Sequence, residues 1–452
     1  MNIKVDSRKV KEGDIFVAIK GIDHDGHDYI DEAIDNGAKQ VVVEHGLYSV
    51  DTLVVKDAHN YLVNYLKDHY YNKIKDLKLI GITGTNGKTT SCYLLWQALN
   101  KLGIKTAYIG TIGFYIDNKI RDLINTTPDI LELYEMFIEA INNNCKYVVM
   151  EVSSHSLTLN RVDGLLFDYA IFTNLTQDHL DYHNNMEDYS LAKQKLFKQI
   201  KGDGYAVINI DDEYSDNYML ENNKNITYGK NNSDYQIIEF KDDIEGSKFK
   251  IKYRDENIDY NTELLGKYNI YNLMNTIIIL NNEKINLNDI KRVVGEITEP
   301  PGRLEKIKLP LGMVIVDYAH TPDAVEKAIK AIKEVCSGKI YTIVGCGGNR
   351  DKTKRPIMGS IATNLSDYVI FTSDNPRNEK PIDIINDIVQ GLDNKNYEIE
   401  ENREKAIFKG IQKLSKNDIL LVLGKGHEDY QIIGNNKIHF SDKEIVLKYI
   451  RR

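Results

Sequence analysis

The residues best suited to chemistry in this sequence form one loop, Gly84-Thr85-Asn86-Gly87-Lys88-Thr89-Thr90. An apolar run, Leu77–Thr83, precedes the loop, and a helical pattern, Ser91–Leu102, follows it. In a strand, turn and helix of this kind, glycines let backbone N–H groups surround a polyphosphate, a lysine reaches the terminal phosphates, and a hydroxyl holds Mg²⁺. The sequence therefore predicts a P-loop in which Lys88 and Thr89 have the last two roles.

The spacing of this loop departs from the common P-loop pattern G-x-x-x-x-G-K-[ST]. That pattern requires glycine at position 82, where this chain has Ile82, and the loop uses Gly84 and Gly87 instead. The departure indicates a sub-family of P-loop proteins. The alternative is a glycine-rich turn that happens to carry a lysine, but strand, glycines, Lys-Thr and helix all occur in the expected order.

Two further side chains in the same part of the chain are candidates for metal binding, and a third, Lys193, is not distinguished by its local pattern. Glu151 ends a predicted strand after the loop, where its carboxylate suits Mg²⁺ opposite Thr89. His179 lies in a polar turn, and its chemistry alone leaves a metal ligand and a structural residue equally open. Lys193 has the local pattern of an ordinary solvated helical lysine.

Polar segments also follow the predicted strands near the C-terminus, and they are Gly345–Lys352, Asp374–Arg377 and Gly424–Asp429. Arg350 and Arg377 offer planar guanidinium groups that fit carboxylates, and Glu428 offers an anion that fits an ammonium group. Together these side chains suit a zwitterionic amino acid. Capped turns in a small α/β domain are the alternative interpretation.

The elements that must position these residues form an α/β protein. Apolar runs alternating with helical patterns predict a central, mostly parallel sheet and a smaller Rossmann-like domain after it. Residues 233–262 instead alternate charged and apolar residues, which predicts an antiparallel excursion. The predicted domains are 1–76, 77–299 and 300–452, with a hinge at Pro300–Arg303.

Composition restricts the possible partners. The chain has 452 residues and a net charge of −9, so nothing favours binding to nucleic acid. Its four cysteines are scattered, as expected for reduced thiols in the cytoplasm. No apolar run approaches the roughly 20 residues of a membrane span, and the N-terminus has no signal-peptide pattern. We expect a soluble, cytoplasmic, monomeric protein with small-molecule partners.

Several motifs in a fixed order resemble the Mur ligase family over nearly the whole chain. They are Gly84–Thr90, Met150–His155, Asn174–His183, Pro301–Arg303, Asp317–His320 and Asp374–Arg377. The resemblance implies a three-domain, ATP-dependent amide ligase of peptidoglycan precursor synthesis that requires Mg²⁺. Such enzymes phosphorylate the D-glutamate carboxylate of UDP-N-acetylmuramoyl-L-alanyl-D-glutamate and let an amino acid's amine attack the acyl phosphate.

The resemblance also implies roles for individual residues. The catalytic residues would be Lys88, Glu151, His179 and Lys193, with Thr89, Glu151 and His179 as Mg²⁺ ligands. In this family the lysine that matches Lys193 is carbamylated, which turns a cation into a carboxylate-like group. Besides Gly84–Thr90, the residues expected to contact ATP are Asn269, Asn272, Arg303, Asp317 and His320.

The muramoyl dipeptide and its UDP-sugar would be held by residues matching Val5, Ser7, Ile22, Asp23, His24, Thr126, Thr127, Ser153, Leu159 and Arg161. A glutamine often stands at the position of Leu159, so one polar substrate contact is expected to be lost there. The sequence also begins directly at the first predicted strand, without the leading helical segment of many relatives.

The added amino acid would be bound by residues matching Arg350, Asp374, Asn375, Pro376, Arg377, Gly424 and Glu428. The motif Asp374–Arg377 is the version associated with meso-2,6-diaminopimelate, whose distal carboxylate can pair with Arg377. L-Lysine would place an ammonium group against that arginine, so diaminopimelate is favoured and lysine is the alternative. Asn349 stands where an aspartate is commoner.

Two other functions are compatible with the ATP-binding motifs. A folylpolyglutamate synthetase shares the fold and the ATP chemistry, but the motifs at Asp374–Arg377 and Gly424–Glu428 argue against it. A nucleotide-binding regulatory protein would hydrolyse ATP slowly and would ignore both dipeptide and amino acid. For a ligase we expect the hinge at Pro300–Arg303 to close, because the ATP and amino-acid motifs lie in different predicted domains.

Overall fold

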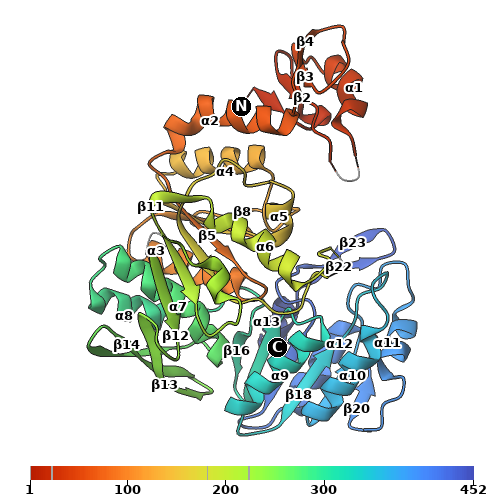
Figure 1. Ribbon diagram of the computed structural model, residues 1–452. Coiled ribbons are helices and arrows are strands. Elements are labelled where there is room, and N and C mark those ends of the chain that lie inside the picture. The colour runs from red at the N-terminus through yellow and green to blue at the C-terminus, as the bar shows by residue number, and fades with distance from the viewer. Residues whose placement is uncertain (1, 22–23, 181, 222–223, 452) are drawn as a thin grey trace. The chain divides into compact units, whose positions relative to one another are not determined.

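The computed structural model of the chain describes residues 2–21, 24–180, 182–221 and 224–451 (Figure 1). Ile22 and Asp23, two residues expected at the UDP-sugar, lie outside the described residues. The chain divides into two compact units, each described below by itself. The first unit comprises Met1–Asn86, Gly103–Ile208 and Asp212–Asn225, and the second comprises Gly87–Leu102, Asn209–Asp211 and Ile226–Arg452. The predicted domain boundaries remain predictions.

The N-terminal part of the first unit is a parallel sheet with strand order β1-β2-β3-β4. Its strands are β1 (Ile3–Lys4), β2 (Ile15–Val17), β3 (Gln40–Val43) and β4 (Asp51–Val54). Helix α1 (Ile30–Asp35) packs into a small apolar core that contains Phe16 and Val41. Helix α2 (Ala58–Ile74) follows, and the Asp57 side chain caps its first turn.

The larger sheet of the first unit has strand order β11-β10-β5-β9-β6-β7-β8. The strands from β11 to β6 run parallel, and β7 and β8 are antiparallel additions. The strand bounds are β5 (Lys78–Thr83), β6 (Thr106–Gly110), β7 (Gly113–Tyr115), β8 (Lys119–Arg121), β9 (Tyr147–Glu151), β10 (Phe167–Phe172) and β11 (Ile200–Asn209). The helices are α4 (Ile130–Asn142), α5 (Ser154–Thr158) and α6 (Met186–Phe197). This part confirms the predicted, mostly parallel sheet.

The second unit begins with helix α3 (Lys88–Lys101), which packs on α7 (Lys267–Asn282) and α8 (Leu287–Glu296). The helix starts one turn before the predicted Ser91, because Gly87 caps it and the polar residues that follow are already helical. Strand β12 (Asn225–Gly229) pairs in parallel with β13. The antiparallel excursion predicted at 233–262 is confirmed as β13 (Tyr235–Asp243), β14 (Gly246–Tyr253) and β15 (Glu256–Thr262).

The C-terminal part of the second unit is a sheet with strand order β16-β17-β21-β18-β19-β20, parallel except at β16. Its strands are β16 (Glu305–Leu309), β17 (Gly312–Asp317), β18 (Ile340–Val344), β19 (Tyr368–Phe371), β20 (Tyr397–Ile399) and β21 (Ile419–Leu423). Its helices are α9 (Pro322–Val335), α10 (Lys354–Leu365), α11 (Pro381–Val389), α12 (Arg403–Lys413) and α13 (Asp442–Ile450). One apolar core joins the sheet to α9, α10 and α11, and a second joins it to α12 and α13. Both faces are therefore covered, as a parallel sheet requires.

A hairpin of β22 (Tyr430–Ile433) and β23 (Asn436–His439) follows β21, and the sequence patterns did not indicate it. Among the described residues, no helix combines the length and the apolar character needed to cross a membrane.

Candidate active site

The loop after β5 uses its glycines for backbone geometry. Gly84 has φ +149° and Gly87 has φ +84°, values that L side chains rarely adopt. A Cβ atom at Gly84 would also collide with the Thr173 hydroxyl. Ile82, which occupies the glycine position of the common P-loop pattern, is a fully buried residue inside β5. The glycines are displaced because the strand continues through position 82.

The first half of this loop is held by the segment that follows β10. Asn174 accepts hydrogen bonds from two loop amides, from Thr85 N to its carbonyl oxygen (2.8 Å) and from Asn86 N to its Oδ1 (3.0 Å). The Thr173 hydroxyl donates to the Asn86 carbonyl (2.7 Å), and Thr176 N donates to Thr85 Oγ1 (3.0 Å). Sequence reasoning found this segment as a polar strand end but did not foresee that it shapes the loop.

Glu151 ends β9 and is 1% exposed. Its Oε1 accepts hydrogen bonds from the Tyr108 hydroxyl (2.6 Å) and from Thr111 N (2.8 Å), and its Oε2 accepts one from the Thr111 hydroxyl (3.1 Å). These hydrogen bonds offset part of the cost of burying the Glu151 carboxyl group. The sequence patterns missed Tyr108 and Thr111, because they lie on β6 and the turn after it.

Residues expected at the muramoyl dipeptide gather beside Glu151 in the first unit. The Thr127 hydroxyl donates to the Glu151 carbonyl (2.9 Å) and accepts from Ser153 N (3.1 Å). Ser153 in turn caps α5, and Arg161 donates to the Thr127 carbonyl (3.3 Å). The remaining two are placed nearby: Thr126 has its hydroxyl 3.2 Å from that of Thr111, and Leu159 is the C-terminal cap of α5.

His179 belongs to a cluster of aromatic side chains. Its ring centroid lies 4.9 Å from that of His155 and 6.1 Å from that of Tyr189, and its φ of +54° is left-handed. His183 and Tyr182 also contact the His155 ring, with centroid distances of 5.9 and 4.1 Å. His155 is therefore the centre of the cluster, although sequence reasoning placed only His179 there as a functional residue.

Lys193 on α6 is 1% exposed, unlike the solvated lysine that its local pattern predicts. Its Nζ donates to the Gly84 carbonyl at 2.9 Å and lies 4.3 Å from the centroid of the Tyr189 ring. Burial raises the pKa of Tyr189 to about 12. The structure thus places Lys193 directly against Gly84, the first residue of the loop after β5.

At the N-terminal sheet, the Ser7 hydroxyl is buried and donates to Glu32 Oε2 (2.6 Å). Val5, at the end of β1, is half-buried. His24 is exposed, and its carbonyl accepts from Gly21 N (2.8 Å).

In the second unit, the two asparagines expected near ATP lie on α7 and are buried. Asn272 Oδ1 accepts from the Ser91 hydroxyl of α3 (3.3 Å), and a Cβ atom at Gly87 would collide with that same oxygen. Asn269 Nδ2 donates to the Leu265 carbonyl (2.8 Å). Asn272 therefore also holds the start of α3 in place.

Asp317 at the end of β17 lies close to Arg303. Its carboxylate accepts from Leu304 N and Ala319 N, both at 2.8 Å. Burial raises the pKa of Asp317, and the charge of Arg303 opposes that rise. Burial also lowers the pKa of His320.

A cavity of about 280 Å³ lies where β17, β21, β18 and β19 end in the C-terminal sheet. It is lined by Tyr318, His320, Gly345, Cys346, Gly347, Arg350, Lys354, Asp374, Asn375, Arg377, Gly424 and Glu428. Every residue predicted to bind the amino acid is in this set except Pro376. The carboxyl ends of neighbouring parallel strands meet at one edge, which brings these distant segments together. Tyr318 and Lys354 also line the cavity and were not predicted to do so.

The hairpin after β21 holds the loop that carries Arg377. Arg377 N donates to the Ile432 carbonyl (3.0 Å), and Gly434 N donates to the Arg377 carbonyl (2.6 Å). Arg377 has φ +50°, and its Nη1 donates to the Gly348 carbonyl (3.0 Å). Burial raises the pKa of Asp374 in the same loop.

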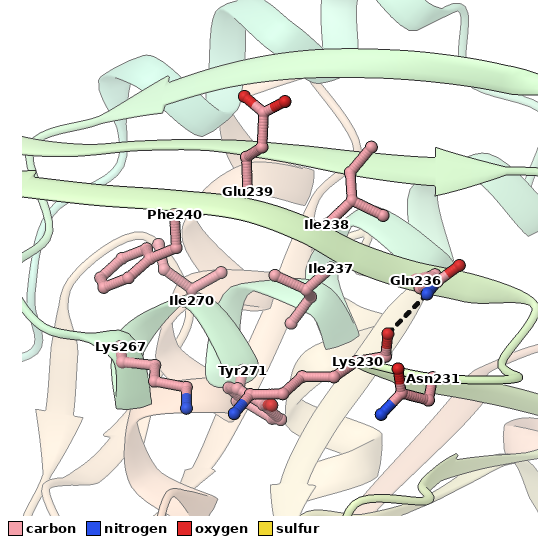
Figure 2. Close-up of a pocket in the computed structure, with 10 residues that line it drawn as sticks. All are labelled: Lys230, Asn231, Gln236, Ile237, Ile238, Glu239, Phe240, Lys267, Ile270 and Tyr271. Atoms are coloured by element: carbon pink, nitrogen blue, oxygen red, sulfur yellow. Dashed lines mark hydrogen bonds between the residues drawn. The ribbon is translucent and has the colours of Figure 1, made fainter.

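A second cavity, of about 510 Å³, lies between β13 and the start of α7 (Figure 2). Figure 2 shows the Lys230 and Lys267 side chains extending beside Tyr271, with Phe240 and Ile270 on the apolar side. The nearby Lys230 ammonium lowers the pKa of Lys267. None of the described residues that line this second cavity is a predicted site residue.

The chain is similar to known proteins over its whole length. Three family profiles match the chain: "Mur ligase family, catalytic domain" over residues 1–73, "Mur ligase middle domain" over residues 82–280, and "Mur ligase, glutamate ligase domain" over residues 302–426. The chain belongs to the Mur ligase family.

Within that family, the similar relatives share one name. UDP-N-acetylmuramoyl-L-alanyl-D-glutamate–2,6-diaminopimelate ligase 1 of Clostridium acetobutylicum is 44% identical, and the match covers 100% of this chain and 94% of the relative. The ligase of Fusobacterium nucleatum with the same activity in its name is also 44% identical, with coverage of 100% and 94%. A solved structure of such a ligase has a TM-score of 0.76 and 32% identity, again covering 100% and 94%.

Proposed function

We propose that this protein is an ATP-dependent amide ligase that adds meso-2,6-diaminopimelate to the D-glutamate of UDP-N-acetylmuramoyl-L-alanyl-D-glutamate, in peptidoglycan precursor synthesis. A carboxylate oxygen of D-glutamate attacks the γ-phosphorus of ATP, and ADP leaves. The neutral amine of diaminopimelate then attacks the acyl phosphate, loses a proton, and releases phosphate. The observation that carries the proposal is the cavity lined by Arg350, Arg377 and Glu428 in a chain of this family.

ATP would bind through Gly84–Thr90, a loop that leads into the N-terminus of α3, where a helix favours negative charge. Lys88 at the first position of α3 would offset the charge of the transferred phosphate. Asn269, Asn272, Arg303, Asp317 and His320 are proposed as the remaining ATP contacts.

Mg²⁺ would be held by Glu151, Thr89 and His179 together with phosphate oxygens. The residues fit this ion, because Glu151 is a buried carboxyl group and Thr89 a buried hydroxyl, and oxygen atoms are the ligands that Mg²⁺ prefers. Among the described residues no group of three or more His, Cys, Asp or Glu side chains forms a complete metal site. Mg²⁺ commonly uses one or two carboxylates and completes its shell with phosphates and water. When bound, the ion would neutralise charge on the transferred phosphate.

Lys193 is proposed to be carbamylated. The modification would replace a buried ammonium group, held against the Gly84 carbonyl, with an anion close to the phosphate-binding loop. Mass spectrometry of the native protein, with and without isotope-labelled bicarbonate, tests this. An unmodified Lys193 in fully active enzyme would contradict it.

The muramoyl dipeptide is proposed to contact Thr126, Thr127, Ser153 and Arg161, which the structure places beside Glu151. The UDP-sugar is assigned to the loops near Val5, Ser7 and His24 on the N-terminal sheet.

The distal carboxylate of diaminopimelate is proposed to pair with Arg377, and the α-carboxylate with Arg350. Arg350 is exposed, and no hydrogen bond to another described residue is found for it, so its guanidinium group has donors available for a ligand. Lysine lacks the distal carboxylate and would place a cation near Arg377. The protein is further proposed to act in the cytoplasm as a monomer, which size-exclusion chromatography with light scattering tests.

The deciding experiment measures phosphate release with ATP, Mg²⁺ and the UDP-linked dipeptide, comparing meso-diaminopimelate with L-lysine. We expect turnover with diaminopimelate and far less with lysine. Equal rates would contradict the assignment of Arg377, and no turnover with either would contradict the ligase assignment. A parallel assay with folate and glutamate is expected to release no phosphate.

A further inference from the structure

Lys425 has a fully buried ammonium group next to the C-terminal cavity. It directly follows Gly424 and is 0% exposed. Its Nζ donates to Glu428 Oε2 at 2.9 Å and to the Tyr430 carbonyl, and it lies 3.4 Å from Asn375 Oδ1. Burying an unpaired ammonium group costs several kcal/mol, so these acceptors and the lysine hold one another in place.

The side-chain partners of Lys425 both line the cavity. Asn375 Nδ2 donates to Glu428 Oε2 (2.8 Å), and Ile432 N donates to Asn375 Oδ1 (2.9 Å). Because the Asn375 oxygen faces two donors, its amide nitrogen must face Glu428. Both strong donors to Glu428 therefore use Oε2. Among the described residues, Oε1 has only the Tyr430 hydroxyl at 3.5 Å, so Oε1 retains acceptor capacity for a ligand.

We infer that Lys425 is a positioning residue for the incoming amino acid, acting through Glu428. This inference rests on the proposed function. Lys425 is not among the residues that line the cavity. It fixes which oxygen of Glu428 meets the ligand's ammonium group and neutralises part of the carboxylate charge.

The charge of Lys425 also bears on the choice of amino acid. The cavity is lined by three cations, Arg350, Lys354 and Arg377, and by two carboxyl groups, Asp374 and Glu428, of which Glu428 is paired with Lys425. Such a lining favours a ligand with two carboxylates over one with an additional uncompensated ammonium group. Removing Lys425 leaves the Glu428 carboxylate without its paired cation. The cavity then attracts an additional ammonium group more strongly, so the discrimination against lysine falls.

The test is steady-state kinetics of full-length Lys425→Met. A charge-assisted hydrogen bond is worth about 1.5–3 kcal/mol. We therefore expect KM for diaminopimelate to rise about tenfold to a hundredfold and the preference over lysine to fall, with KM for ATP changed less than about twofold. Lys201→Met is the matched control, since Lys201 also pairs with a carboxylate at 2.9 Å, that of Asp168 on β10. It should leave all three values near those of the parent.

A double-mutant cycle separates positioning from a general structural role. If Lys425 acts through Glu428, adding Lys425→Met to Glu428→Gln raises KM for diaminopimelate less than about twofold further. A folded Lys425→Met with the parent's KM, or full additivity in the cycle, would overturn the inference. If Lys425→Met does not fold, Glu428→Met and Lys425→Met/Glu428→Met replace the cycle, since the double variant leaves no unpaired charge. If Glu428→Met and the double variant have the same KM for diaminopimelate, the inference is supported. A higher KM in the double variant overturns it.

The outcomes for the two proposals are distinguishable. If the parent enzyme itself shows no diaminopimelate-dependent phosphate release, the proposed function has failed. If the parent is active and Lys425→Met has the parent's KM for diaminopimelate, the inference about Lys425 has failed and the proposed function stands.

Discussion

The loop after β5 and the C-terminal cavity handle charge by different means. The loop relies on backbone conformation, with Gly84 and Gly87 at positive φ and with hydrogen bonds to Thr173 and Asn174 that shape it. The cavity relies on charged side chains, Arg377 and Glu428 among them, and charged residues behind it support the loops that carry them. The loop therefore depends on local backbone geometry, whereas the cavity depends on the pairing of buried charges.

From this contrast we expect substitutions in the two regions to affect different properties of the protein. A substitution at Lys88 in the loop should remove chemistry with a smaller loss of stability, because this side chain is only half-buried. A substitution behind the cavity should lower stability, because each buried ion there depends on its partner.

The largest expected effect is on stability, at Arg403. This residue is fully buried and donates to both oxygens of Asp442, from Nε at 2.7 Å and from Nη2 at 2.6 Å. It also donates to the Leu423 carbonyl at the end of β21 (2.9 Å). Arg403→Ala should reduce the free energy of unfolding by about 3–5 kcal/mol, measured by urea denaturation.

The control for Arg403 is the joint replacement Arg403→Met/Asp442→Leu, which leaves no unpaired charge and should recover most of the loss. A loss below about 1 kcal/mol for Arg403→Ala would contradict the view that buried ions support the cavity.

The next largest effect is on chemistry, at Lys88. Lys88→Met should reduce phosphate release about a thousandfold, because the transferred phosphate loses its fixed cation. The free energy of unfolding should change by less than about 1 kcal/mol, as for typical substitutions away from buried charges. Lys101→Met, at the other end of α3, is the control and should retain activity. Normal turnover by Lys88→Met would exclude this loop as the ATP site.

A smaller effect is expected on affinity, at Arg377. Arg377→Ala should raise KM for diaminopimelate about tenfold to a hundredfold, since one charge-assisted pair with the distal carboxylate is lost. KM for ATP should stay unchanged. Lys352→Ala removes a nearby cation that pairs with Glu379 at 3.4 Å outside the cavity lining, and it should leave both KM values unchanged. Equal changes in both variants would point to general electrostatics instead of recognition.

The smallest effect is a pH dependence of stability at Glu379. Hydrogen bonding to the Arg355 guanidinium lowers the pKa of Glu379 from 4.5 to about 2. A folded-state pKa below the unfolded value stabilises the protein fully above pH 4.5, and this contribution is lost as the pH falls toward 2. Because solvent screens this pair, we expect it to contribute about 1 kcal/mol to the free energy of unfolding. Its loss in Glu379→Gln should make the acid-unfolding transition shallower. An identical acid transition in the variant would show that the pair contributes nothing.

Local patterns were sufficient where an element is defined by its own residues. The apolar run of β5 and the glycines after it predicted the strand and the turn, and the alternation after residue 300 predicted β17, β18, β19 and β21. The start of α3 was wrong by one turn, because Thr89 and Thr90 are polar but buried in the helix.

Supporting residues escaped prediction because their partners are far away in the sequence. Tyr108 and Thr111 hold a carboxylate that lies 40 or more residues later. Lys425 has the sequence surroundings of a loop lysine, and only the meeting of β19 and β21 with the hairpin shows that it is buried between Asn375 and Glu428.

By itself, the sequence determined the family, the class of fold and the place of the glycine turn after β5, because these depend on residue order and on local periodicity. Only the tertiary structure decided which side chains share the cavity at the ends of β17, β21, β18 and β19, and which buried charges hold it. The physical reason is that parallel strands gather distant segments at one edge, and the cost of a buried charge depends on neighbours that no local pattern records.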